Sequence, residues 1–167
     1  MLEQPVDGVL GCDPAVAMAH LRAVDPVLGR LIDNVGPPQI EMLGTLSIFE
    51  ALAQAIVYQQ LHAKAASTIF GRVMALCPPE RGGLCADVLL STSDDDLRAA
   101  GLSRQKLLAL RDLARRTVDG ELPTLDEIRL LDDKEIIKRL TPVRGIGRWT
   151  AEMLLIFRLG RDFGLKS

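Results

Sequence analysis

The chain has 167 residues and a formal net charge of −2, and its 48% hydrophobic and 25% charged residues are typical of a globular protein, which argues against disorder. The longest apolar run near the C-terminus, residues 153–157, is far too short to cross a bilayer. The three cysteines form no C-x-x-C pair, which disfavours a disulfide framework, a zinc site and an iron–sulfur cluster, so we expect a cytoplasmic protein with no metal site.

Short helices are predicted along the whole chain by capping residues and by stop signals. An aspartate followed by proline opens two helices near the N-terminus, at Asp13-Pro14 and Asp25-Pro26, which end near residues 23 and 35. Ser47 and Glu50 have the spacing of a capping box and open a helix with a buried apolar stripe. The remaining predicted helices lie at residues 63–76, 93–101, 103–118, 125–130, 132–140 and 148–160. No segment alternates apolar and polar residues as a strand would, so the predicted fold class is all-α, with residues 1–167 as a single helical unit.

Charge is distributed unevenly along the chain. Residues 1–133 carry 12 Lys and Arg against 19 Asp and Glu, whereas residues 134–167 carry 8 against 3. A basic segment on an acidic body can bind a polyanion locally, because screening limits charge interactions to about 10 Å at physiological salt. Charge alone does not separate this interpretation from an ordinary solvated face.

The segment between the last two predicted helices, residues 143–151, reads VRGIGRWTA. Gly145 and Gly147 allow a turn with positive φ and a close approach of phosphate to the backbone, and the free N–H groups of the next helix favour an anion. Arg144 and Arg148 add positive charge beside them. Alone, Gly-x-Gly before a helix is a weak motif that also suits a tight interhelical turn. A dinucleotide site is disfavoured, because no strand precedes the glycines and no third glycine follows.

This hairpin between two helices resembles the helix-hairpin-helix of DNA glycosylases. Three further stretches resemble the alkylpurine (3-methyladenine) DNA glycosylase II branch: FEALAQAIVYQQLHAKAA at 49–66, GLSRQK at 101–106 and WTAEMLLIFRLGR at 149–161. The resemblance implies a helix-hairpin-helix DNA glycosylase fold, with a central helical lobe at about 40–122 and a helix-hairpin-helix segment at 123–161 that packs with the N-terminal helices. It implies a monofunctional DNA N-glycosylase, a hydrolase of base-excision DNA repair that cleaves the N-glycosidic bond of alkylated purines in duplex DNA.

The resemblance also assigns DNA-binding residues. Hairpin amides would grip the phosphate backbone, often with a monovalent cation at the hairpin main chain and with no other cofactor. A wedge between two helices would fill the gap left by a flipped nucleotide. The implied DNA contacts are Gln60, His62, Val143, Arg144, Gly145, Ile146, Gly147, Arg148 and Thr150. Without the family, Gln60 suits a helix C-cap and His62 an N-cap, and Lys64 and Lys106 suit either a phosphate contact or solvent.

The chain has one Trp and one Tyr, and both are candidates for the base pocket. An electron-rich ring can stack on a cationic methylated purine, which favours Trp149 and Tyr58 as pocket residues. Trp149 stands where bifunctional relatives carry a Schiff-base lysine, which implies base excision without strand cleavage. Core packing is the alternative for both, and it is preferred for Tyr58.

The catalytic residue is not assigned by the sequence. The family depends on an aspartate after the last helix, and the motif places it beyond Ser167; Asp162 comes too early and suits a surface position. The resemblance therefore implies a C-terminally truncated member without the closing helices, and we expect exposed apolar surface there, with an oligomer or reduced stability as its result. A catalytically inactive damaged-DNA-binding module is the alternative function, and a helical interaction protein is the third. Any of the DNA-related functions implies association with the nucleoid if the source is bacterial.

Overall fold

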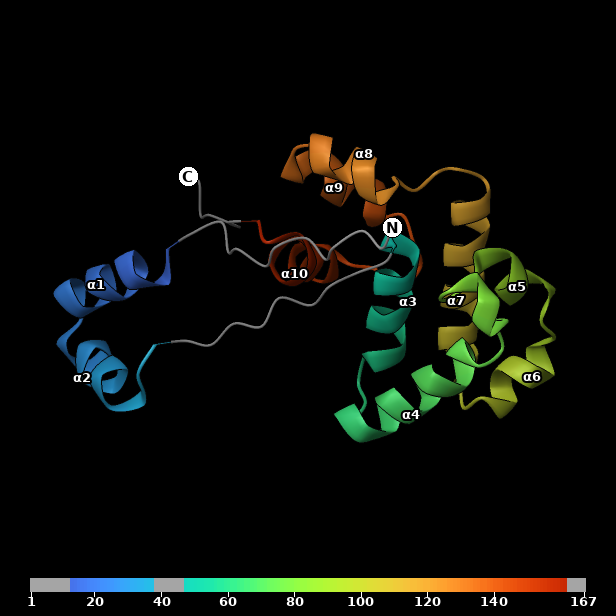
Figure 1. Ribbon diagram of the computed structural model, residues 1–167, viewed down its shortest axis with the longest axis horizontal. Coiled ribbons are helices and arrows are strands. Elements are labelled where there is room, and N and C mark those ends of the chain that lie inside the picture. Colours follow the sequence, from blue (N-terminus) through green and yellow to red (C-terminus); the bar gives the residue numbers. More distant parts are fainter. Residues whose placement is uncertain (1–12, 38–46, 162–167) are drawn as a thin grey trace. The chain divides into compact units, whose positions relative to one another are not determined.

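The computed structural model describes residues 13–37 and 47–161, and all regular structure in these ranges is helical (Figure 1). The α-helices are α1 (Pro14–Val24), α2 (Pro26–Val35), α3 (Ile48–Tyr58), α4 (Ala63–Met74), α5 (Ala86–Ser91), α6 (Asp94–Ala99), α7 (Arg104–Val118), α8 (Leu125–Leu130), α9 (Asp133–Leu140) and α10 (Arg148–Leu159), and a 3-10 turn, η1, covers Pro79–Arg81. The all-α prediction is confirmed. In the described ranges, no helix is long and apolar enough to cross a membrane.

The chain divides into two compact units, residues 1–44 with 155–167, and residues 45–154. In the first unit, α1 and α2 begin at the two predicted caps: Asp13 accepts the N–H of Ala15 at 2.8 Å, and Asp25 accepts the N–H of Val27 at 2.8 Å. The two helices pack on each other. The organisation of residues 1–167 as a single unit stays a prediction, and Cys12 and Asp162 lie outside the described residues.

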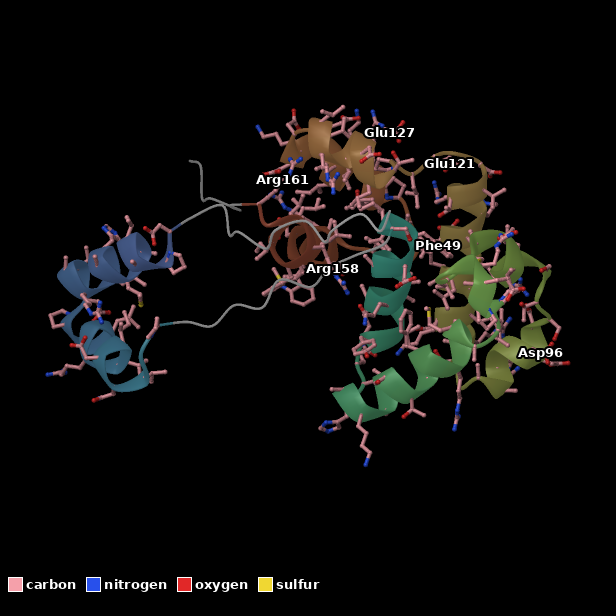
Figure 2. All side chains as sticks on the ribbon, viewed as in Figure 1. Phe49, Asp96, Glu121, Glu127, Arg158 and Arg161 are labelled. Carbon is pink, nitrogen blue, oxygen red and sulfur yellow. The ribbon has the colours of Figure 1, made fainter. Side chains whose placement is uncertain are left out.

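The second unit is built around α3 and α7, which pack against each other, while α5 and α6 pack on α7 and α4 packs on α3 (Figure 1). Seven of the eleven residues of α3 are buried, among them Phe49, which Figure 2 labels. The buried face of α7 includes residues at helical spacing: Leu107, Leu110, Leu113 and Ala114. On α4, Ala66 and Val73 are buried, whereas Ile69 and Phe70 are half-buried.

Side-chain caps explain most of the helix starts in this unit. The Ser47 hydroxyl accepts the N–H of Glu50 at 3.1 Å, as the capping pattern predicts. The Glu50 carboxylate accepts the N–H of Leu84 at 3.1 Å, which ties the start of α3 to the segment before α5. At α8 the box is reciprocal: Glu127, labelled in Figure 2, exchanges hydrogen bonds with Thr124 through its backbone N–H and its carboxylate.

Helix α5 and the turn η1 are not predicted by the sequence. The residue before α5, Cys85, makes no side-chain cap, so local capping gives no signal. The C-terminal end of α5 is held from α7, where the Arg111 guanidinium donates to the carbonyls of Leu89, Leu90 and Thr92. A six-residue helix is marginal alone, and here it depends on a residue nearly 20 positions further along the chain.

Candidate nucleic-acid interface

The hairpin between α9 and α10 is built from two consecutive turns. The N–H of Val143 donates to the carbonyl of Leu140 at 3.1 Å, and the N–H of Ile146 donates to the carbonyl of Val143 at 3.0 Å. Val143 and Ile146 are buried, at 1% and 3% exposure. Their side chains therefore anchor the hairpin in the core, and only their main-chain groups are available to a ligand.

The two hairpin glycines are present for different physical reasons. Gly145 has a φ of +83°, and a Cβ there would lie 3.5 Å from the Cβ of Ala109 on α7. A left-handed conformation costs an L-residue about 1–2 kcal/mol, so the turn itself requires this glycine. Gly147 does not have a positive φ, and a Cβ there would meet nothing within 4 Å. The fold does not need a glycine at position 147, whereas a ligand that approaches the backbone closely would.

Helix α10 begins immediately after Gly147, and its first N–H groups have no acceptor within the helix. The carbonyl of Gly147 accepts the N–H of Ala151 at 3.1 Å, which is the first bond of the helix. The N–H groups of residues 148–150 precede that bond and have no acceptor within the helix. Arg144 and Arg148 are both exposed beside them, although the Arg148 guanidinium also pairs with Glu152 at 2.6 Å. This positive helix end suits an anion such as a phosphate.

Asp112 on α7 holds the hairpin by a hydrogen bond to its backbone. Its carboxylate accepts the N–H of Arg144 at 2.9 Å and pairs with Arg116 at 3.1 Å and Arg115 at 3.4 Å. Burial by itself would raise the pKa of Asp112, but the hydrogen bond from Arg144 and the pairing with Arg116 outweigh it and hold the pKa below its usual value. Asp112 is therefore a structural anion rather than a proton acceptor for catalysis.

We expect Asp112→Asn to lower the free energy of unfolding by about 1 kcal/mol at neutral pH, because the amide keeps an acceptor for Arg144 and loses the charge that pairs with Arg116. A lowered pKa in the folded state stabilises the protein above the unfolded value of 3.8, and this stabilisation disappears as the pH falls through the folded pKa. Urea titrations from pH 7 to about pH 3 should therefore show the difference between wild type and variant narrowing at the acidic end. Asp95→Asn, at an exposed position on α6, is the control, and a difference for Asp112→Asn that stays constant over this range would contradict the assignment.

The loop between α3 and α4, residues 59–62, presents three exposed side chains, those of Gln60, Leu61 and His62. Gln60 has a φ of +56°, the sole positive φ among the described residues that are not glycine. A left-handed glutamine is uncommon, and such strained positions cluster at functional sites. Gln59, not Gln60, is the C-cap of α3, and His62 occupies the N-cap position of α4 without making a side-chain cap bond. Capping therefore does not account for the Gln60 and His62 side chains.

Two residues that sequence reasoning missed or misjudged connect this loop to its surroundings. The Gln59 side-chain amide donates to the carbonyl of Gly145 at 2.8 Å. The Lys106 ammonium on α7 donates to the carbonyls of Val57 at 2.6 Å and Gln59 at 2.8 Å, and burial lowers its pKa. Lys106 is half-buried, and its ammonium is engaged by the C-terminal end of α3 rather than free to reach a phosphate. Lys64 is exposed on α4, so both alternatives for it stand.

The two aromatic candidates have different environments. Trp149 lies in the first turn of α10 with 69% of its surface exposed, so core packing does not explain it. Tyr58 is half-buried, and its ring meets Phe70 edge-on with centroids 6.3 Å apart, which is the packing role that the sequence favoured. Thr150 is half-buried next to Trp149.

Comparison with known proteins identifies the family to which this chain is similar. Residues 53–159 match the family described as HhH-GPD superfamily base excision DNA repair protein. DNA-3-methyladenine glycosylase 1 of Schizosaccharomyces pombe is 39% identical over 149 residues, which are 87% of this chain and 64% of that protein. DNA-3-methyladenine glycosylase of Saccharomyces cerevisiae is 30% identical over 161 residues, 87% of this chain and 53% of its own length. The chain thus spans between half and two thirds of the length of these two relatives.

Solved structures agree with this match. The S. pombe 3-methyladenine DNA glycosylase in complex with abasic DNA superposes with a TM-score of 0.77 at 37% identity, covering 90% of this chain and 73% of that one. A Bacillus halodurans DNA-3-methyladenine glycosidase gives a TM-score of 0.69 at 34% identity, covering 96% and 69%. The family match covers more than half of the chain, and it includes both the 59–62 loop and the hairpin. The chain therefore belongs to the HhH-GPD superfamily of base excision DNA repair proteins.

Proposed function

We propose that this protein is a monofunctional DNA glycosylase that hydrolyses the N-glycosidic bond of alkylated purines, of the 3-methyladenine type, in duplex DNA. The observation that carries the proposal is the hairpin end of α10. There the open position at Gly147 lies next to the exposed Trp149 and to the N–H groups of residues 148–150, which have no acceptor within the helix. Relatives named as 3-methyladenine glycosylases, one of them solved on abasic DNA, support the same substrate class and partner.

Backbone binding is assigned to the hairpin. A DNA phosphate would accept N–H groups of residues 147–150, with Arg144 and Arg148 supplying positive charge. Such contacts position the enzyme without reading sequence, which suits an enzyme that must act wherever damage occurs. A monovalent cation at the hairpin carbonyls also remains a proposal.

Base extrusion is assigned to the 59–62 loop. Flipping a nucleotide leaves an unstacked gap that costs a few kcal/mol, and an inserted side chain offsets part of that cost. Gln60 and His62 are exposed at this loop. We propose Gln60 as the side chain that fills the gap and His62 as a contact in the groove beside it.

Trp149 is proposed to stack on the extruded base. A methylated purine carries positive charge, and stacking of a cation on an indole contributes about 0.5–2 kcal/mol. An indole has no amine to form a Schiff base, so the proposed reaction is hydrolysis. The oxygen of water bonds to C1′ of the sugar and water releases a proton to solvent. The glycosidic bond breaks with its electron pair going to the cationic base, which leaves neutral, and both DNA strands stay intact. Among the described residues near the hairpin, Asp112 and Glu152 are both engaged by arginines, so neither is proposed as the group that activates water.

The cellular location is proposed to be the compartment that holds DNA, which is the cytoplasm and its nucleoid in a bacterium. Cys77 and Cys85 are free thiols, and free thiols fit a reducing compartment.

The test is release of methylated purines from alkylated duplex DNA by the 167-residue chain, together with its affinity for duplex carrying a tetrahydrofuran abasic analogue. We expect a preference for the abasic duplex. Release above spontaneous depurination, with no strand cleavage, would show that a group of this chain activates water in place of the aspartate that the family motif puts beyond Ser167. Trp149→Ala should slow release about ten-fold and Trp149→Phe less, because the phenyl ring keeps a weaker stack. Both variants should melt like the wild type, since the indole is mostly exposed.

Two results would contradict parts of the proposal. Preference for abasic DNA without release would replace excision by damaged-DNA binding. Equal affinity for abasic and undamaged duplex, with no release, would remove the DNA-repair role from this chain altogether.

A further inference from the structure

We propose that Gln59 is a positioning residue that holds the 59–62 loop and the 143–147 hairpin together. Phosphate binding at the hairpin and insertion of the Gln60 side chain into the DNA are then energetically coupled. This inference rests on the proposed function and assigns a role to a residue that contacts neither the phosphate nor the base. One hydrogen bond joins these two segments, which lie far apart in the sequence. The Gln59 side-chain amide donates to the carbonyl of Gly145 at 2.8 Å.

Both backbone polar groups of Gln59 are hydrogen-bonded. Its N–H donates to the carbonyl of Ala55 at 3.2 Å, and its carbonyl accepts the Lys106 ammonium at 2.8 Å. Lys106 also binds the carbonyl of Val57, two residues earlier, at 2.6 Å. With the backbone of Gln59 fixed by α3 and α7, its side chain reaches the hairpin from a rigid base.

The hairpin is held equally firmly on its other side. The N–H of Arg144 donates to the Asp112 carboxylate at 2.9 Å, and Gly145 lies against Ala109 on the same helix. The carbonyl that Gln59 binds therefore belongs to a turn that α7 has already placed. The end of α3 is thus connected to α7 in two ways, directly through Lys106 and indirectly through Gln59 and the hairpin. All these contacts lie within residues 45–154.

The side chains on the two sides of this bond differ in exposure. Gln59 is half-buried, whereas the next three residues, 60–62, are exposed. Gln59 thus lies at the start of the loop that carries Gln60 and His62, and its side-chain amide binds the hairpin. Removing the amide donor should leave both segments folded, because each keeps its own contacts with α7, and should abolish the direct hydrogen bond between them.

Energetic coupling between the two segments tests this role directly. We would measure affinity for duplex with a tetrahydrofuran abasic analogue in a double-mutant cycle of Gln60→Ala and Gly147→Ala, in the wild-type background and in Gln59→Met. Methionine keeps the length of glutamine and cannot donate a hydrogen bond. In the wild-type background, the affinity of the double variant should differ by at least about three-fold from the value expected if the two single losses of affinity were independent. In the Gln59→Met background, the double variant should match that expected value to within about two-fold.

Two further variants keep the test independent of folding. Gln105→Met, at an exposed position on α7, makes the same chemical change and should keep the wild-type coupling. Gln59→Asn keeps the amide but is one methylene too short to reach Gly145, so it should lose the coupling as Gln59→Met does. Melting curves of each variant identify any that fails to fold, and a purely structural role for Gln59 would change those curves while leaving the coupling intact.

The outcomes separate this inference from the proposed function. Coupling that persists in both Gln59→Met and Gln59→Asn, or that is absent from the wild type while abasic DNA is still preferred, overturns the positioning role alone. A wild type with no preference for abasic DNA overturns the proposed function and this inference with it.

Discussion

Lys106→Met is expected to lower the free energy of unfolding by about 3 kcal/mol, because it removes two hydrogen bonds from a charged donor and leaves two carbonyls unpaired. The ammonium donates to Val57 at 2.6 Å and to Gln59 at 2.8 Å, and Val57 is fully buried. Methionine has no donor for these carbonyls, so the last turn of α3 loses the cap that the ammonium provides. The measurement is a urea titration monitored by circular dichroism, with the slope compared as well as the midpoint.

Lys134→Met is the matched control for this prediction. Lys134 is exposed on α9, and surface substitutions away from specific contacts change stability by about 0.5 kcal/mol or less. Both variants lose one positive charge and gain one methionine, so a net-charge effect would appear in both. Equal urea midpoints for Lys106→Met and the wild type would show that the two carbonyls find other donors.

Helix positions could be predicted from the sequence wherever the capping residue is local. Asp13, Asp25, Ser47, Ser103 and Thr124 each accept an N–H two or three residues further on, and a contact over that range is visible in the sequence itself. The buried stripes of α3 and α7 follow the helical period for the same reason.

The contacts that sequence reasoning did not find all join distant segments. The Gln59 amide bond to Gly145 spans 86 positions, and the Lys106 bonds to the end of α3 span 47 and 49. A lysine on a helix and a glutamine at a helix end have many other uses, so the residue type alone gives no partner. Helix α5 belongs to the same class, because its cap comes from Arg111 on α7.

The paired glycines of the hairpin show the same limit within the site. For the pair, the sequence predicts a turn with positive φ and a close approach of phosphate to the backbone, without saying which glycine serves which purpose. The positive φ is found at Gly145 and not at Gly147. Only the backbone conformation and the space around each residue separate a glycine needed by the turn from one the fold would replace freely. That difference makes position 147 suitable for a substitution that affects ligand binding and spares the fold.

Gly147→Asp is expected to weaken binding to the abasic duplex at least 30-fold, about 2 kcal/mol, while the protein melts at or above the wild-type temperature. Aspartate is a preferred residue before a helix and places a negative charge at its positive end, which stabilises the helix. The added side chain meets no atom within 4 Å at its Cβ. The same carboxylate occupies the N–H groups that a phosphate would use and repels the phosphate itself.

Three comparisons make this result specific. Thr124→Asp adds one negative charge at the N-cap of α8, outside the hairpin and the 59–62 loop, and should keep most of the affinity. Gly147→Ser supplies the cap without the charge. Its loss of affinity should therefore be intermediate, and it shows how much of the loss comes from steric exclusion.

Affinities measured over a range of salt concentrations should give a slope of log K against log salt that is smaller by about 1 for Gly147→Asp, the value of one lost phosphate contact. An unchanged slope with unchanged affinity would place the DNA backbone elsewhere on the protein, whereas lost affinity with an unchanged slope would point to a disturbed loop rather than a lost phosphate.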